Sequence, residues 1–133
     1  MANWKKHFGG VSTSVEGLDK LKWNLGKFTK EMEAAIPTAL AAGGEIVRNE
    51  ALGIMKNRYA KPIWKTGNLA RSIHVEPVSK NEVRIGTNVE YGVYQEYGTK
   101  KMAARPYLRP AYDENREKIF EKIKTILAFI AKK

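Results

Sequence analysis

The sequence predicts an α+β fold in which long N-terminal and C-terminal amphipathic helices pack on one face of a small antiparallel β-sheet. Apolar residues recur at spacings of three and four through residues 18–58, and again from about residue 107 to the end. Between these segments, apolar and polar residues alternate at 72–78 and 82–87 around a polar turn, which is typical of a β-hairpin. We therefore expect one apolar face of the hairpin to cover the apolar stripes of the helices.

The length of 133 residues fits one domain. We expect a flexible arm at residues 1–10, followed by a single α+β domain at 11–133 with a protruding loop at about 98–106. The chain has no cysteine, which excludes disulfides, thiolate catalysis and cysteine-ligated metal centres. No run of about eighteen apolar residues occurs and no apolar segment follows the basic start, so we expect neither a transmembrane helix nor a secretory signal.

The chain is strongly basic, with a formal net charge of +10. Such a charge favours nucleic acid, an anionic membrane or an acidic protein as a partner. The lysines and arginines are spread along the chain and mixed with glutamates in both helical segments. A solvated basic face therefore explains the charge better than a dedicated phosphate-binding stripe does, and a small basic DNA-binding protein is the alternative function.

The first helical segment contains two unusual features. Pro37 either kinks one long helix or starts a second one, because proline is well tolerated only in a first turn. Gly43 and Gly44 are costly in an isolated helix, but such small residues would let another backbone approach closely. Ahead of this segment, residues 11–15 alternate apolar and polar side chains and predict a short strand.

Several glycines and prolines mark expected turns and helix ends. Thr66 would cap a helix of one or two turns, which places Gly67 at the first helical position, and Gly86 would end the hairpin. Tyr91, Tyr94 and Tyr97 fall at spacings of three on one side of a short helix, and Gly98 would stop that helix. The residues expected in turns or caps are thus Thr66, Gly67, Gly86, Gly98, Pro106 and Pro110.

The residues that follow Gly98 have no periodicity and predict a loop that leads into the last helix. The loop has too little apolar content to order itself, and we expect it to gain order from a neighbouring subunit. Pro106 and Pro110 would make its exit rigid, because proline fixes φ and restricts the residue before it.

The tyrosines beside this loop have two interpretations. They pack on the hydrophobic core with their hydroxyls at its rim, or they belong to a protein interface, where tyrosine and arginine concentrate binding energy. We favour an interface for the loop and its flanks. The candidate contact residues for another subunit or a partner are Tyr97, Thr99, Lys100, Lys101, Met102, Arg105, Tyr107 and Arg109.

The residues that could support catalysis are few and scattered. His7 lies in the N-terminal arm, and His74 alternates with apolar neighbours, so it should face solvent from a strand. Neither histidine has further metal ligands or an orienting carboxylate at a suitable spacing. Only Glu90, Glu96 and His74 would be available to an enzyme such as a small hydrolase. We expect no catalytic residues, no metal and no cofactor.

Four motifs in order resemble a family of tailed-phage proteins. They are TGNLARSI at 66–73, IGTNVEY at 85–91, YQEYGT at 94–99 and MAARPYLRPA at 102–111. This region, about 66–111, is similar to the "gene product ten" type of head–tail joining or tail-completion protein of long-tailed phages and prophages. The helices on either side agree with that family in kind.

The resemblance implies a non-enzymatic structural protein of the virion. Such a protein would form a ring of identical subunits in the neck or at the head-proximal end of the tail, after assembly in the cytoplasm of the bacterial host. Closed rings require heterologous contacts, which suits a loop that reaches a neighbouring subunit. Its expected partners are further copies of itself and other neck or tail proteins, with room for a transient contact with DNA in the conduit. No membrane or small-molecule substrate is expected.

Overall fold

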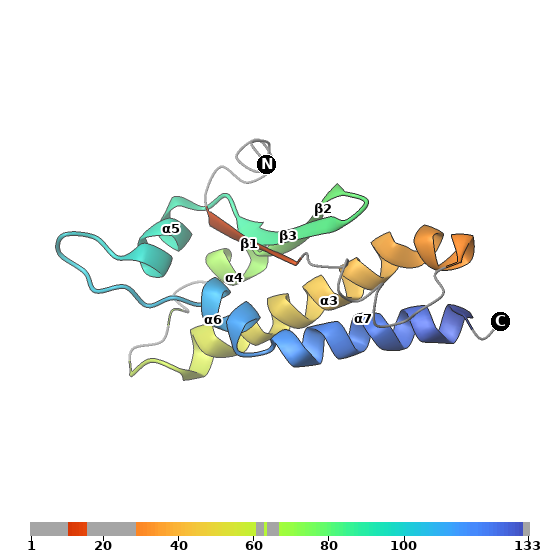
Figure 1. Ribbon diagram of the computed structural model, residues 1–133. Coiled ribbons are helices and arrows are strands. Elements are labelled where there is room, and N and C mark those ends of the chain that lie inside the picture. The colour runs from red at the N-terminus through yellow and green to blue at the C-terminus, as the bar shows by residue number, and fades with distance from the viewer. Residues whose placement is uncertain (1–10, 16–28, 61–62, 64–66, 132–133) are drawn as a thin grey trace.

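Helix α3, Lys30–Asn57, is the longest element among the residues that the structure describes. The computed structural model describes residues 11–15, 29–60, 63 and 67–131 (Figure 1). Thr29 caps α3: its backbone is extended and its hydroxyl accepts a hydrogen bond of 3.1 Å from the Met32 N–H. The helix therefore does not continue from residue 18 as expected, and it runs through Pro37 without ending there. The rest of that expected segment, 18–28, lies outside the described residues.

Three strands form an antiparallel sheet in the order β1-β3-β2. They are β1 (Val11–Val15), β2 (His74–Ser79) and β3 (Glu82–Thr87). The strand at 11–15 and the hairpin are thus confirmed, with an irregularity in the pairing between Pro77 and Ser79. Residues 86–88 were expected to end the hairpin, and β3 does end at Thr87. Gly86, which was expected in a turn, lies instead inside β3, aligned with Ser12 on one side and His74 on the other.

The glycine pair of α3 allows two layers to pack on that helix at once. A Cβ atom on Gly43 would lie 3.1 Å from side-chain atoms of Ile119 and Ile123 in α7, Arg116–Ala131. A Cβ atom on Gly44 would lie only 2.7 Å from a methyl group of Val75 in the sheet. Helix α3 consequently lies directly on the sheet, and α7 packs along α3 (Figure 1).

The buried apolar side chains lie between these layers and confirm the predicted fold class. From α3, β3 and α7 they include Ile36, Leu40, Val47, Met55, Val83, Ile85, Ile119, Ile123 and Leu127. At the margin of this core, the Arg48 Nε donates a hydrogen bond of 2.9 Å to the Ile73 carbonyl, and Lys118 pairs with Glu50 at 3.0 Å. Apolar burial thus holds α3, the sheet and α7 together, and polar links close the edges.

The predicted C-terminal helix is divided in two. Helix α6, Leu108–Asp113, is separated from α7 by Glu114 and Asn115. The Asn115 side chain donates a hydrogen bond of 2.9 Å to the Ala111 carbonyl, and the Asn115 carbonyl accepts one from the Ile119 N–H. Asparagine competes in this way for backbone groups, so a change of direction between the two helices occurs without any glycine or proline.

A one-turn helix, α4, precedes the hairpin and spans Asn68–Ser72. Gly67 was expected at its first helical position but is its N-cap, with φ of 79°. This left-handed conformation favours glycine, because a Cβ atom would be strained there. Thr66, the expected cap, lies outside the described residues.

Among the described residues, no helix has the length and apolar character needed to span a membrane.

Candidate protein-interaction site

Helix α5, Glu90–Tyr97, carries the three tyrosines but buries a different face. Its buried residues are Gly92, Gln95 and Glu96. Tyr91 is half-buried against the core, whereas Tyr94 and Tyr97 are exposed by 42% and 67%. The expected packing of the tyrosines on the core therefore applies only to Tyr91. The other two rings face solvent, which is unusual for side chains of that size.

Tyr107 is a core residue, which corrects its expected role in an interface. Its side chain is fully buried, and its hydroxyl donates a hydrogen bond of 3.0 Å to the Gly92 carbonyl. Burial raises the pKa of Tyr107, so this hydroxyl stays protonated as a donor. A Cβ atom on Gly92 would lie 2.7 Å from the Tyr107 oxygen and 2.7 Å from a Thr87 methyl group. Gly92 thus lets α5 pack directly on Tyr107.

Glu96 lies in helix α5, but its side chain caps the start of helix α6. This glutamate is 7% exposed. Its Oε1 accepts hydrogen bonds from the Tyr107 and Leu108 N–H groups at 3.0 and 2.9 Å, and its Oε2 accepts one from the Arg109 N–H at 3.2 Å. The N-cap of α6 has no side-chain cap of its own. A carboxylate is favourable there because it satisfies unpaired N–H groups and the positive end of the helix dipole.

Gln95 holds the middle of the following loop. It is fully buried; its backbone carbonyl accepts a hydrogen bond of 2.7 Å from the Arg105 N–H, and its side-chain oxygen accepts one of 3.0 Å from the Arg105 Nε. Its amide nitrogen lies 3.9 Å from the Met102 sulfur. Arg105 and Met102 are half-buried. Part of the surface of both expected contact residues is therefore covered by their own chain.

The loop between α5 and α6 is ordered by its own hydrogen bonds, contrary to expectation. Gly98 ends α5 with φ of 77°, and a Cβ atom there would lie 2.8 Å from the Ala104 nitrogen. Thr99 and Met102 exchange backbone hydrogen bonds of 2.8 and 3.3 Å across a tight turn. The Tyr59 hydroxyl donates a hydrogen bond of 2.8 Å to the Pro106 carbonyl at the far end. Figure 1 shows this loop extending away from the helical layers.

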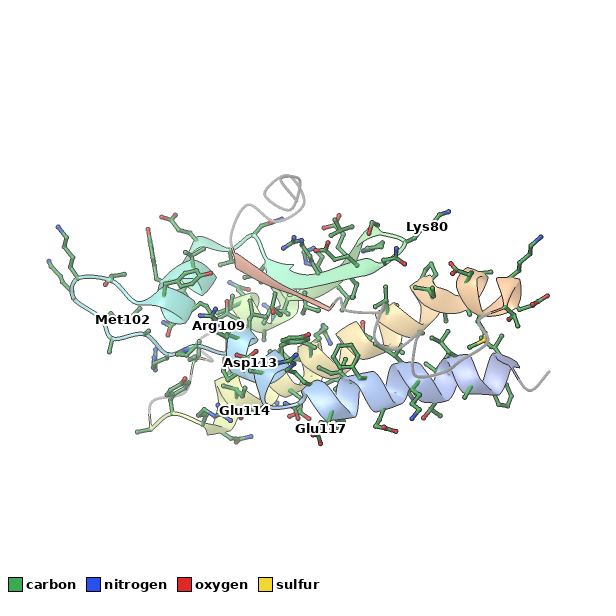
Figure 2. All side chains as sticks on the ribbon, in the orientation of Figure 1. Lys80, Met102, Arg109, Asp113, Glu114 and Glu117 are labelled. Atoms are coloured by element: carbon green, nitrogen blue, oxygen red, sulfur yellow. The ribbon has the colours of Figure 1, made fainter. Side chains whose placement is uncertain are left out.

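Large exposed side chains of this region lie on α5 and at the loop turn. We name the set of Tyr94, Tyr97, Lys100 and Lys101 the Tyr–Lys surface; all four are exposed. Tyr94 was not among the expected contact residues, and its hydroxyl donates a hydrogen bond to Glu90 that raises the pKa of Tyr94. Met102 marks the position of the loop in Figure 2.

The remaining expected residues lie around the base of the loop. Thr99 is exposed, and its hydroxyl accepts a hydrogen bond of 3.2 Å from the Lys101 N–H. Arg109 is exposed in the first turn of α6 (Figure 2), where its own N–H contacts Glu96. Pro110 occupies that same turn, where a missing N–H costs no helical hydrogen bond.

Sequence reasoning missed Gln95 and Glu96 as structural residues. A polar pair inside a tyrosine-rich helix is ordinarily solvent-exposed, and its partners lie ten to thirteen residues later in the chain. The only available signal was the spacing of α5 itself, which places Gly92, Gln95 and Glu96 on one face.

Glu90, Glu96 and His74, the residues available to an enzyme, contact other groups of the chain. Glu90 accepts from Tyr94, and both oxygens of Glu96 accept backbone N–H groups. His74 is exposed; its Nδ1 lies 2.9 Å from the Ser72 carbonyl oxygen, and its Nε2 lies 3.9 Å from a carboxylate oxygen of Glu76. In the part of the chain that the structure describes, no three histidine, aspartate or glutamate residues are grouped to hold a metal ion.

The chain was compared with known proteins. Neither the curated proteins nor the solved structures contain a match to it. A family model described as "Bacteriophage HK97-gp10, putative tail-component" matches residues 19–98, which is more than half of the chain. The match includes the region before residue 66 and stops at Gly98, so it is shifted towards the N-terminus relative to the four motifs and does not reach the loop. The chain belongs to the HK97-gp10-like family of bacteriophage proteins, and this membership indicates a role as a phage tail component.

Proposed function

We propose that this protein is a non-enzymatic structural component that forms a ring of identical subunits in the phage neck or at the head-proximal end of the tail. Family membership supports the tail role. The ring and its position are our extension of it. A ring needs two different patches on each subunit, one meeting the other on the next copy.

The observation that carries the proposal is the Tyr–Lys surface. Two exposed tyrosine rings lie on α5, and two exposed lysines follow in the loop directly after that helix. Exposed tyrosines of this kind concentrate binding energy when they become buried in a contact. Hydrogen bonds of Gln95 with Arg105 and of Glu96 with Tyr107 fix the backbone that carries this surface. Little backbone entropy is therefore lost when a partner binds.

The basic charge fits contacts with protein better than tight contacts with DNA. A conduit through which DNA slides should not hold it, and each phosphate that is neutralised strengthens holding. We therefore assign Lys100 and Lys101 to a protein contact, and we expect DNA to be bound weakly and only at low salt.

The first test is self-assembly of the purified chain, measured by native mass spectrometry over a range of protein concentrations. We expect wild-type protein to form a closed ring, and Tyr94→Ala/Tyr97→Ala to require about tenfold or more protein for the same assembly. Phe129→Ala is the matched control, because Phe129 is an aromatic residue of similar exposure, 63%, on α7. If the control weakens assembly and the tyrosine variant does not, the surface is assigned wrongly.

The second test places the ring in the virion. In a phage whose genome encodes this chain, the double tyrosine variant should leave filled heads and free tails that do not join. Electron microscopy distinguishes unfinished tail ends from incomplete necks on heads. Normal infectious particles from the variant would contradict the proposed role.

A further inference from the structure

We propose that the Tyr–Lys surface of one copy docks on an acidic helix face of a second copy, formed by Asp113, Glu117 and Glu121 at the end of α6 and along α7. This inference rests on the proposed self-assembly and adds the pair of surfaces that meet. It follows from how charge is divided within the chain, from which charges are already paired, and from where the two surfaces lie.

The balance of charge changes on either side of Tyr112. Between Tyr97 and Tyr112 the chain has four basic residues and no acidic one. Between Asp113 and Glu121 it has four acidic residues and two basic ones, Arg116 and Lys118, of which Lys118 is paired with Glu50. An exposed segment with an excess of acidic residues provides a surface complementary to the chain's own basic loop.

The existing ion pairs leave three of these acids available. Glu114 is held by Arg58 through two hydrogen bonds, which excludes it from the face. Asp113, Glu117 and Glu121 are exposed, and they make no ion pair within the described part of the chain. Residues 117 and 121 are four apart on α7, so their carboxylates lie on neighbouring positions of one helix side.

The two surfaces cannot satisfy each other within one subunit. In Figure 2 the loop that carries Met102 lies at one end of the molecule and points away from α7, whereas Asp113 and Glu117 lie nearer the middle of its length. Hydrogen bonds to Gln95 and Glu96 hold the loop in that direction. A loop fixed away from its own acidic face reaches that of another copy, and repetition of this head-to-tail contact forms a ring or a filament.

The contact has a defined chemistry. Lys100 and Lys101 would pair with the carboxylates of the acidic face at the rim of the contact. The rings of Tyr94 and Tyr97 would cover the methylene groups of these charged side chains. Because exposed pairs of this kind are screened, raising the salt concentration should weaken assembly.

Charge exchange in the full chain tests the pairing. Lys100→Glu/Lys101→Glu and Asp113→Lys/Glu117→Lys should each raise the protein concentration needed for assembly about tenfold, because like charges then meet. The variant that carries all four substitutions should return to near the wild-type concentration. Lys30→Glu/Lys80→Glu is the control; it changes the net charge as much as the loop variant does, at exposed lysines outside both surfaces.

Each outcome has a separate meaning. All substituted residues are exposed, so thermal unfolding should be unchanged in every variant. If wild type assembles but the fourfold variant does not recover, or if both double variants assemble normally, this pairing is overturned while the proposed ring stands. If wild type remains monomeric at every concentration, both the pairing and self-assembly of the chain alone are overturned.

Discussion

The α3–α7 region and the α5–loop–α6 region are built on different principles. Helix α3 is covered by apolar side chains of α7 and the sheet, and its glycines allow close packing. The second region is joined through buried polar groups: the Glu96 carboxylate, the Gln95 amide and the Tyr107 hydroxyl. Apolar packing tolerates exchanges between apolar side chains of similar volume, whereas a buried polar group that loses its partner costs its full desolvation energy. Polar joints of this kind fix a direction, which suits a loop that presents a surface.

The largest expected effect comes from the residue where the two regions meet. Tyr107→Ala should lower the free energy of unfolding by about 3–5 kcal/mol, since it removes a fully buried aromatic ring. Tyr107→Phe keeps the ring and leaves the Gly92 carbonyl without its partner, which should cost about 1–2 kcal/mol. Chemical denaturation of both variants measures the difference. Equal losses would mean that the ring contributes nothing beyond its hydroxyl.

Removal of the remote cap should disturb one region and spare the other. Glu96→Ala leaves three backbone N–H groups without their acceptor, and we expect a loss of about 2 kcal/mol. Hydrogen exchange should accelerate in the first turn of α6 and in the loop while α3 stays protected. Glu96→Gln, which keeps one acceptor oxygen, should show a smaller change. Uniform acceleration across the chain would contradict the separation into two regions.

Close packing in the apolar region can be tested at two glycines of the same helix. Gly44→Ala should destabilise the protein by about 1 kcal/mol, because the new methyl group would lie too close to Val75. Gly53→Ala, where nothing lies within 4 Å, should stabilise it by up to about 1 kcal/mol through helix propensity. Thermal unfolding of the pair gives the sign of each change. If Gly44→Ala stabilised the protein as Gly53→Ala does, the sheet would have moved to accommodate the methyl group.

The smallest effect is expected from the ion pair between the ends of α3 and α6. Arg58 lowers the pKa of Glu114 from its ordinary value of 4.5 through their hydrogen bonds. A lowered pKa adds stability that is complete above the unfolded value and disappears as the pH falls through the folded value. Glu114→Gln should therefore be slightly less stable than wild type at neutral pH and equal to it in strong acid. Denaturation curves at the two pH values would show this, and a gap that persists in acid would contradict it.

Much of the fold was predictable because its signals are local. The periodicity of apolar residues located α3 and α7, alternation located the three strands, and Gly98 marked the end of α5. The start of α3 at Lys30 and the break at Glu114 and Asn115 were not predicted, since an apolar stripe continues across both positions. Tyr107 was assigned to an interface because tyrosine and arginine concentrate binding energy at protein contacts. Its burial depends on Gly92, fifteen residues away.

Spacing along the chain was enough to predict the fold class, the three strands and, through the order of the motifs, the family. These properties follow from local patterns, because the spacing of apolar residues along the chain differs between helices and strands. The burial of Gln95 and Glu96, the hydrogen bonds within the loop, and the exposure of Tyr94 and Tyr97 became apparent only from the folded chain. Those properties depend on hydrogen bonds between residues that are distant in sequence, and no local pattern specifies where a carboxylate will find its donors.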